Sequence, residues 1–352
     1  MAGDDLGRRA RHRRQLDGPG AVQQRPRRDR HPRLQDHPGG AAQSIGDGQD
    51  AYGATAQTGC GIGEVETHES LDPILTLWRS VKPNTGGPGY HRGGQGLEQA
   101  WQLRYGDALD GPGFNSSAEV PSRGFGGGYP GATSNHCPLD EHHAERVIAD
   151  RRSPTLEAIA APGRVRSSIG RRHFDRGDVE LWTSGGGGGL GDPLLREVER
   201  VERDLRHGYV TARHAEAAYG VVIGPDGRVD AEATARSRAA VREARIGGVR
   251  QAEQRLPADV GVAVVRAGAD WGCGYCGAVL APGGENWRTG GAAVLRETPV
   301  HERFRELDVY VKERLEEPAV LLREYFCGRC AGALTVDVGT AGSPPDAQPA
   351  LD

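Results

Sequence analysis

The sequence is poor in long apolar runs, in lysine and in net charge. No run approaches the roughly 18 to 20 apolar residues that a membrane helix requires, so we expect no membrane segment. Arginines rather than an apolar stretch follow Met1, which argues against a secretory signal and favours the cytoplasm. Only Lys82 and Lys312 are lysines, and the formal net charge is −4. Because no concentrated positive field results, we expect no nucleic-acid partner.

Hydrophobic residues are also scarce, at 36% of the chain, whereas glycine is abundant, at 54 of 352 residues. A lean core with a turn-rich backbone is typical of loop-heavy β architectures. We therefore expect an α+β protein, in which a Gly-rich, β-dominated domain ends in helices and is followed by a small zinc-binding α+β module. The predicted boundaries are 1–47 for a disordered Arg/Pro/Gly-rich segment, 48–246 for the Gly-rich domain, 247–258 for a linker, 259–340 for the zinc module and 341–352 for a disordered tail.

Local patterns predict the elements of the Gly-rich domain. Alternation of apolar and polar residues predicts strands at 74–78, with 65–70 leading into it, and at 97–105. In 82–96 the glycines permit positive φ and the prolines fix turns. Two further Gly-rich segments, 123–131 and 184–189, lack the lysine of a phosphate loop and the ribose-binding acid of a dinucleotide site. We therefore expect none of the three Gly-rich segments to be a nucleotide-binding loop.

Capping patterns predict helices near the end of this domain. Asp192 and Pro193 form the N-cap and first residue of a helix that runs through Leu205, with Gly208 beyond its end. The patterns further predict a helix from a Thr211 cap to Tyr219, a short strand at 221–223, a turn at 224–227 and a helix at 231–245.

Seven of these segments carry a resemblance to a known family. They are 66–69, 85–96, 123–131, 185–194, 207–210, 219–222 and 226–230. Together, over about 200 residues, they resemble the C-terminal part of the hydantoinase B/5-oxoprolinase large subunits, which include subunits of acetone and acetophenone carboxylases. The resemblance implies a hetero-oligomer in which a hydantoinase-A-type subunit binds ATP. ATP then activates a carbonyl or bicarbonate, and the large subunit completes amide hydrolysis or C–C bond formation.

The chain also departs from that family. The large subunits are longer and carry a Gly/His/Asp-rich N-terminal half that resembles a metal-binding catalytic region, and that half has no counterpart here. Residues 1–47 do not resemble the family, so we expect a truncated gene, a frameshift or a displaced start codon. A basic RNA-binding arm is the alternative for this segment, although it lacks aromatic stacking residues. The resemblance assigns no catalytic or cofactor-binding residue.

Two Cys-x-x-Cys-Gly-like knuckles in the C-terminal region predict a metal site. One contains Cys273 and Cys276, and the other contains Cys327 and Cys330. Two-residue spacing lets both thiolates of a knuckle reach one ion, and four thiolates close a tetrahedral, structural zinc site. Two disulfides, a thioredoxin-type redox pair and an iron–sulfur cluster are the alternatives, and each fits the compartment or the spacings less well.

The gap between the knuckles exceeds the usual ribbon spacing of about 15 to 20 residues, so a folded element must lie within it. Thr298 and Pro299 predict the start of a helix over 300–315, and 317–324 is a helix or a strand. The module 259–340, and residues 322–334 in particular, resembles the small gamma subunit of acetone carboxylase, which favours ketone carboxylation as the activity of the complex. Cyclic amide hydrolysis, as in N-methylhydantoinase or 5-oxoprolinase, is one alternative, and a non-catalytic scaffold is the other.

Several further polar clusters are candidate sites, and each also has a purely structural explanation. His136, Cys137, Asp140, His142 and His143 could ligate a metal, but a polar loop explains them better. We expect Cys60 and Cys137 to be unpaired thiols rather than nucleophiles. His68 with Glu66 and Glu69 forms either an acid/base group or a solvated strand edge. His91 and Arg92 bind an anion or hold their turn in shape. The amides of Gly185 to Gly189 form an anion site or a flexible connection.

Overall fold

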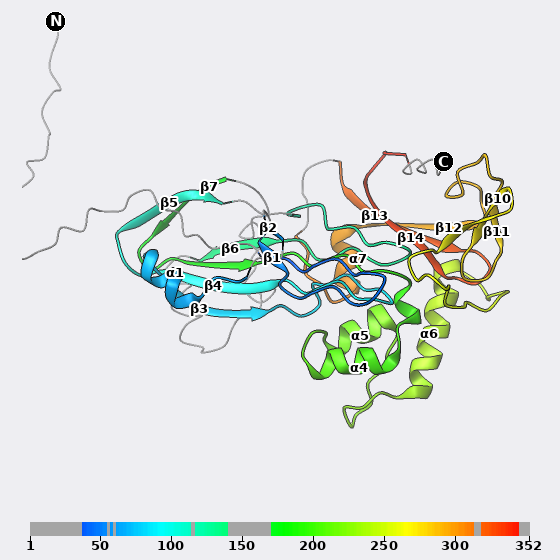
Figure 1. Ribbon diagram of the computed structural model, residues 1–352, viewed down its shortest axis with the longest axis horizontal. Helices are drawn as coiled ribbons and strands as arrows, with labels where there is room; N and C mark the ends of the chain where they lie inside the picture. The colour runs from blue at the N-terminus through cyan, green and yellow to red at the C-terminus, as the bar shows by residue number, and fades with distance from the viewer. Residues whose placement is uncertain are drawn as a thin grey trace, which may run out of the picture.

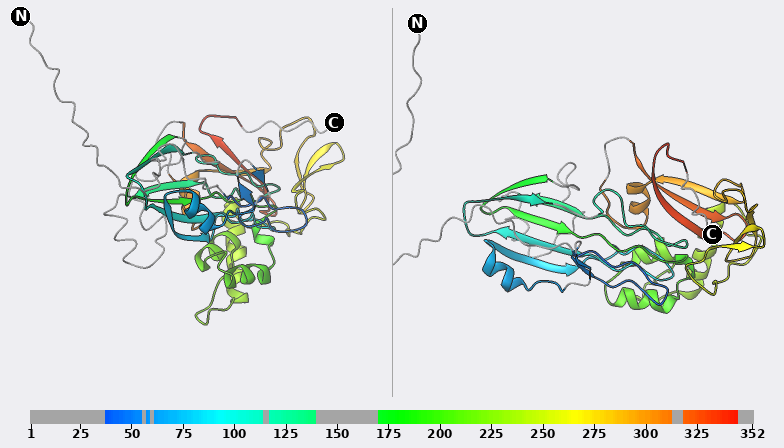
Figure 2. Two further views of the ribbon diagram at one scale, coloured as in Figure 1. Left: turned by 60° about the vertical axis from the view of Figure 1, so that its left-hand side comes forward. Right: turned by 45° about the horizontal axis from the view of Figure 1, so that its top comes forward.

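The computed structural model describes residues 37–54, 57–58, 61–113, 117–139, 170–312 and 318–344. It is a mixed α+β fold, as predicted. Figure 1 shows an elongated molecule with an antiparallel sheet at one end, a second group of strands at the other, and a middle built of extended chain. Helices α4, α5 and α6 lie together on one side of that middle, as the two further views in Figure 2 also show. Within the described ranges, no helix has the length and apolar character to cross a membrane.

The first sheet confirms the two predicted strands and corrects the segment before them. Its antiparallel strands lie in the order β3 (Ile74–Val81), β4 (Leu97–Leu103), β8 (Val179–Thr183) and β6 (Asn135–Leu139). The residues that were expected to lead into β3 in extended form instead make helix α1 (Val65–Leu71). The backbone N–H of Thr76 donates to Glu69 at 2.7 Å, which docks this helix against β3. Six residues of alternation are too few to distinguish the two periods.

The described residues contain two further small strand pairs. β5 (Ala108–Gly113) pairs with β7 (Gly170–Asp175), and β1 (Gly53–Ala54) pairs with β2 (Gln57–Thr58). Both pairs are antiparallel.

The middle of the molecule is a bundle of extended Gly-rich segments, which we call the glycine bundle: 37–50, 84–96, 122–134 and 184–191. Its segments bond to one another through the backbone; for example, Gly187 donates to the carbonyl of Gly94 at 3.0 Å and accepts from Gly87 at 2.8 Å. The expectation of positive φ is wrong for the glycines of 86–96, none of which has positive φ, and Gly185 to Gly189 have none either. They are needed because backbones approach too closely for a Cβ atom.

The glycine bundle includes the end of the segment that was expected to be disordered. Residues 37–47, which were expected to be disordered, form one of its segments: Gly39 donates to the carbonyl of Gly185 at 3.0 Å, and Gly48 donates to that of Arg92 at 2.7 Å. At the other end, Ala341 donates to the carbonyl of Ala319 at 2.9 Å, so the start of the predicted tail is bonded too. Residues 1–36 and 345–352 lie outside the described residues.

The helices near the glycine bundle follow their predicted caps, with one break. The single helix expected after Asp192 is a 3-10 turn, η1 (Pro193–Leu195), followed by α4 (Val198–Arg206). Arg196 has extended backbone between them, and its buried guanidinium binds carboxylates there. Helices α5 (Ala212–Tyr219) and α6 (Ala231–Ile246) are confirmed; Thr211 caps α5 as predicted, and the structure adds Asp230 as the cap of α6. The turn at 224–227 is confirmed, whereas the predicted strand at 221–223 is only one bridge, from Ile223 to Val229.

The C-terminal region contains two three-stranded sheets and one helix. The sheets are β11-β10-β9 and β12-β13-β14, and both are antiparallel. The bounds are β9 (Val264–Ala267), β10 (Asp270–Cys273), β11 (Val279–Ala281), β12 (Ala293–Pro299), α7 (Val300–Glu306), β13 (Val320–Cys327) and β14 (Ala333–Thr340). The gap between the knuckles is therefore folded, as expected.

Helix α7 is shorter than predicted and starts differently. Thr298 belongs to β12 and Pro299 occupies the cap position, so the helix gains no side-chain cap. It ends at Glu306 because Asp308 has φ of +59° and turns the chain back, which buries Val309. The segment 317–324, which was predicted as helix or strand, contributes to strand β13.

One hydrophobic cluster joins the residues on both sides of the predicted linker. Val201, Ala215 and Tyr219 of α4 and α5 pack in the same cluster as Phe304 of α7 and Leu322 of β13. The metal-binding region and the glycine bundle with its helices therefore share a core. The predicted domain boundaries themselves stay predictions.

Substituting alanine for Gly187 should destabilise the protein by about 1–3 kcal/mol, the usual cost of overpacking. A Cβ at this position would lie 1.9 Å from the carbonyl oxygen of Gly40, which is backbone and cannot swing away. Gly248→Ala is the matched control, because nothing lies within 4 Å of its Cβ position. Urea unfolding of both variants measures the difference, and equal midpoints would show that the bundle tolerates side chains.

Candidate metal centre

The structure brings the four predicted cysteines together. Cys273 ends β10 and Cys327 ends β13, and each is followed by a tight turn that carries the second cysteine of its pair. All four Sγ atoms lie within 4.8 Å of one another. Two separations between different knuckles are 3.8 Å from Cys273 to Cys330 and 3.8 Å from Cys276 to Cys327. Both knuckles therefore face one common point.

These separations fit a tetrahedral metal site. They are far longer than a disulfide bond of about 2.05 Å. A regular tetrahedron with Zn–S bonds of about 2.3 Å has S–S edges of about 3.8 Å. The cluster could therefore hold a metal such as zinc between four sulfur ligands.

The ionisation of these four cysteines also fits a metal site. Hydrogen bonds from Cys273 and Cys330 lower the pKa of Cys327, bonding to Cys327 raises the pKa of Cys273, and bonding to Cys273 raises that of Cys330. Neighbouring thiolates within 4.8 Å would repel one another. A divalent cation at the centre would stabilise the deprotonated form of all four.

Backbone and aromatic groups shape the centre. Gly277 donates to the carbonyl of Cys273 and Ala331 donates to that of Cys327, both at 2.8 Å, which closes the two turns. Trp271, Tyr275, Trp287, Tyr325 and Leu334 pack around the cysteines. Cys276 is partly exposed and the other three cysteines are buried. With four sulfurs and an apolar surround, the centre offers no open coordination position and suits a structural ion.

Asp192 connects the metal centre to the rest of the chain. Its buried carboxylate accepts two bonds from the Arg245 guanidinium, at 2.7 and 3.0 Å, and one from Gln254 at 2.7 Å. It also accepts from the backbone of Leu194 at 3.0 Å and of Ala333, just beyond the second knuckle, at 2.9 Å. Burial alone would raise the pKa of Asp192, but Arg245 and these donors lower it from 3.8 to about 2.

A second contact joins the first knuckle to the glycine bundle. The Tyr275 hydroxyl, between Cys273 and Cys276, donates to the carbonyls of Ala333 at 2.9 Å and Gly126 at 3.1 Å. Both knuckles are thus tied to the body of the protein by buried polar contacts.

A buried ionic network holds the N-terminal segment of the glycine bundle. Arg196, which is 0% exposed, donates to Asp47 and Asp204, both at 2.7 Å, and Arg200 donates to Asp47 at 2.8 Å. Burial opposes ionisation of Asp47, but these arginines hold its pKa well below the usual value. Long-range pairs of this kind leave no local pattern in a sequence, and only the capping role of Asp192 was predictable.

A third buried carboxylate, Glu324 of β13, lies across from the glycine bundle. It binds Arg296 of β12 and Arg303 of α7, and it accepts a short hydrogen bond from the hydroxyl of Tyr129. Burial would raise the pKa of Glu324, but Arg303 and Arg296 lower it. The spacing of these residues in the sequence gives no signal for this contact.

The remaining candidates divide between structural roles and undescribed residues. Nδ1 of His136 lies 2.6 Å from Oε1 of Glu180, and its ring stacks on Trp182. Both contacts lie inside the first sheet, next to buried Cys137. Asp140, His142, His143 and Cys60 lie outside the described residues. His136 and Cys137 lie on strand β6 and not in the polar loop that was expected.

The turn and helix candidates have structural partners. Arg92 binds Asp50 at 3.0 Å and so holds its own segment in shape. The strand spacing assumed for Glu66, His68 and Glu69 is wrong, because they lie on α1. Gly185 to Gly189 are buried, and the amides of Gly186, Gly187 and Gly189 donate to backbone carbonyls. They form neither a free anion site nor a flexible connection.

Residues 23–193 match the model of the Hydantoinase B/oxoprolinase family. The match begins inside the segment 1–47, which corrects the expectation that this whole segment is unlike the family. It ends before the four cysteines.

Two curated relatives align over a longer stretch. The acetone carboxylase alpha subunit of Xanthobacter autotrophicus is 31% identical over 231 residues, which are 59% of this chain and 29% of that protein. The caprolactamase subunit beta of Pseudomonas jessenii is 29% identical over 206 residues, which are 57% of this chain and 32% of that protein. A solved nucleotide-free acetone carboxylase covers 60% of this chain and 30% of its own, with 26% identity and a TM-score of 0.47. The chain thus spans about a third of the length of the relatives it matches.

Proposed function

We propose that the chain is a subunit of an ATP-dependent complex of the hydantoinase family, and that the complex carboxylates ketones. The observation that carries this proposal is the 31% identity over 231 residues to an acetone carboxylase alpha subunit. The family match over residues 23–193 supports the same family for the complex. Because the chain spans about a third of such subunits, its share of the reaction is argued from its own residues.

The proposed role of this chain is to hold an interface rather than to react. Three of its buried or partly buried carboxylates are engaged with arginines: Asp47 with Arg196, Asp192 with Arg245, and Glu324 with Arg296. Such pairs fix the relative positions of segments, and no poised acid or base arises from them. A hydantoinase-A-type partner would bind ATP and activate the carbonyl substrate or bicarbonate in this hetero-oligomer.

The four cysteines are proposed to bind zinc in a module like the gamma subunit of acetone carboxylase. The ion would supply no chemistry to the substrate, because four thiolates fill its coordination sphere. It would fix the ends of β10 and β13, and through Ala333 and Asp192 it would hold them against the glycine bundle. This arrangement supports a fused accessory module that stabilises an assembly.

Co-expression with a hydantoinase-A-type subunit from the same genome tests the proposal. The expected result is a co-purifying complex whose ATP hydrolysis rises with acetone and bicarbonate, compared with the partner alone. ATP turnover that rises with caprolactam, hydantoin or 5-oxoproline instead would assign the complex to cyclic amide hydrolysis. That alternative has the support of the caprolactamase relative. A complex whose ATP hydrolysis none of these substrates stimulates would indicate that the chain is a non-catalytic scaffold. The absence of any complex would contradict the proposal.

A further inference from the structure

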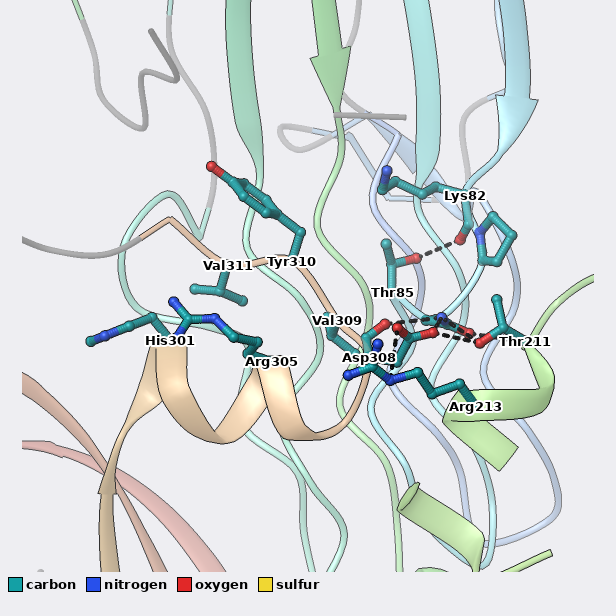
Figure 3. A pocket seen from close by; sticks show the side chains of 12 residues that line it. Lys82, Thr85, Thr211, Arg213, His301, Arg305, Asp308, Val309, Tyr310 and Val311 are labelled. Atoms are coloured by element: carbon teal, nitrogen blue, oxygen red, sulfur yellow. Dashed lines mark hydrogen bonds and ion pairs between the residues drawn. The ribbon is translucent and has the colours of Figure 1, made fainter. Parts of the chain in front are cut away.

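A cleft of about 520 Å³ opens between the glycine bundle and helix α7. Three distant parts of the chain line it: 82–85 at the end of β3, the start of α5 with Thr211 and Arg213, and 301–311 from α7 onward. Figure 3 shows Lys82 on one side, Arg213 on another, and His301 and Arg305 on α7. The volume lies within the range of small-molecule sites, about 300–1,000 Å³.

The floor of the cleft is built from interlocked polar side chains. Asn84 is 7% exposed; its amide nitrogen donates to Thr211 at 3.1 Å and to the carbonyl of Asp308 at 3.0 Å, and its oxygen accepts from the backbone of Thr211 at 2.9 Å. The Thr211 hydroxyl donates to the carboxylate of Asp308 at 2.7 Å. Asn84 and Asp308 have φ of +64° and +59°. Two non-glycine residues with left-handed backbone, bonded to each other, are a strained arrangement of the kind that clusters at binding sites.

Cationic groups outnumber acidic ones in this cleft. Its charged lining is Lys82, Arg213 and Arg305, with His301, against a single carboxylate on Asp308. Lys82 is balanced by Glu98 at 2.7 Å, and Asp308 lies 3.6 Å from Arg213 while it accepts from Thr211. Arg305 is exposed and makes no ion pair with any residue in the described part of the chain. One guanidinium at the cleft is thus without a paired carboxylate among the described residues.

We propose that this cleft binds a small organic molecule through a carboxylate or phosphate group. Arg305 and Arg213 would contact the oxyanion, because guanidinium groups match the geometry of both anions. The apolar walls, with Val309, Val311 and Pro83, would contact a short uncharged part of the ligand. Because residues of the glycine bundle and of the α7 segment both line the cleft, a bound ligand would link α7 to the glycine bundle.

Titration calorimetry on the full chain tests this site with three probes of similar size: phenyl phosphate, phenylacetate and neutral phenylacetamide. At least one anion should bind saturably, more weakly at high salt, whereas phenylacetamide should not bind. The stronger of the two anions identifies the group that the site prefers. Arg305→Gln and Arg213→Gln should each weaken anion binding about tenfold, as expected for loss of a charged hydrogen bond.

Arg236→Gln is the matched control, because Arg236 is 71% exposed, like Arg213 at 72%, and does not line the cleft. It should bind the anions as the wild type does, and thermal melts should show all three variants folded. Equal anion binding by Arg305→Gln and Arg236→Gln would overturn the proposal, as would equal binding of phenylacetamide or the absence of saturable binding. The titration needs neither ATP nor a partner, so its outcome is independent of the proposed carboxylation.

Discussion

Replacing Cys330 with serine should release the metal and unfold the C-terminal sheets. The variant removes one of four sulfur ligands at the centre of a cluster whose Sγ atoms lie within 4.8 Å of one another. Structural zinc in small peptides contributes about 10–16 kcal/mol of folding free energy at neutral pH. Even part of that amount is comparable to the total stability of a domain, about 5–15 kcal/mol. We expect zinc content to fall from about one ion per chain to near zero, with a large loss of thermal stability.

Cys137→Ala provides the control for this experiment, because Cys137 is buried in the first sheet and away from the cluster. It should lose some packing energy yet keep its zinc. Elemental analysis and thermal melts of both variants, purified without chelator, distinguish the two effects. A Cys330→Ser protein with full zinc content and an unchanged melt would show that this residue is not a ligand.

Replacing Asp192 with asparagine should cost about 3–5 kcal/mol, the usual penalty for breaking a buried ion pair. Arg245 would stay buried beside a neutral group. All five bonds to Asp192 come from donors, so the amide nitrogen of asparagine would face another N–H group whichever way it turned. Urea unfolding measures the loss. Exposed Asp175, 74% accessible, serves as the control in Asp175→Asn, which should be near neutral.

The same substitution should change the response to acid. The pKa of Asp192 is about 2 in the folded protein, below its ordinary value of 3.8. A depressed folded pKa gives stability that is complete above the unfolded pKa and is lost as pH falls through the folded one. The wild type should therefore lose about 2 kcal/mol from this group between roughly pH 5 and pH 2. Asp192→Asn should lack this part of the acid transition, and identical pH profiles would contradict the assignment.

Local signals in the sequence predicted the local features well. The spacing of the cysteines identified all four sulfurs of the cluster, because ligand spacing is a short-range constraint. The predicted Thr211 cap sets the start of α5 for the same reason, since its side chain accepts from the backbone of His214 three residues later. Asp192 was predictable as a cap, since its carboxylate accepts from Leu194 two residues later.

The remaining features depend on contacts between distant residues. Glycines in 84–96 were expected to permit turns, yet, like Gly185 to Gly189, they serve close packing of four extended segments, which composition alone cannot reveal. The break at Arg196 follows from its partner Asp47, 149 positions away. The contact of Glu324 with Tyr129 spans 195 positions. Such pairs carry no periodicity, so the joint between the metal-binding region and the glycine bundle became visible only in three dimensions.

X-ray absorption at the zinc edge, on native protein purified without chelator, tests the central claim that four thiolates hold one structural zinc ion. We predict about one zinc per chain with a first shell of four sulfurs at about 2.3 Å and no nitrogen or oxygen ligand. Protein without zinc, or zinc with oxygen or nitrogen in its first shell, would contradict the account.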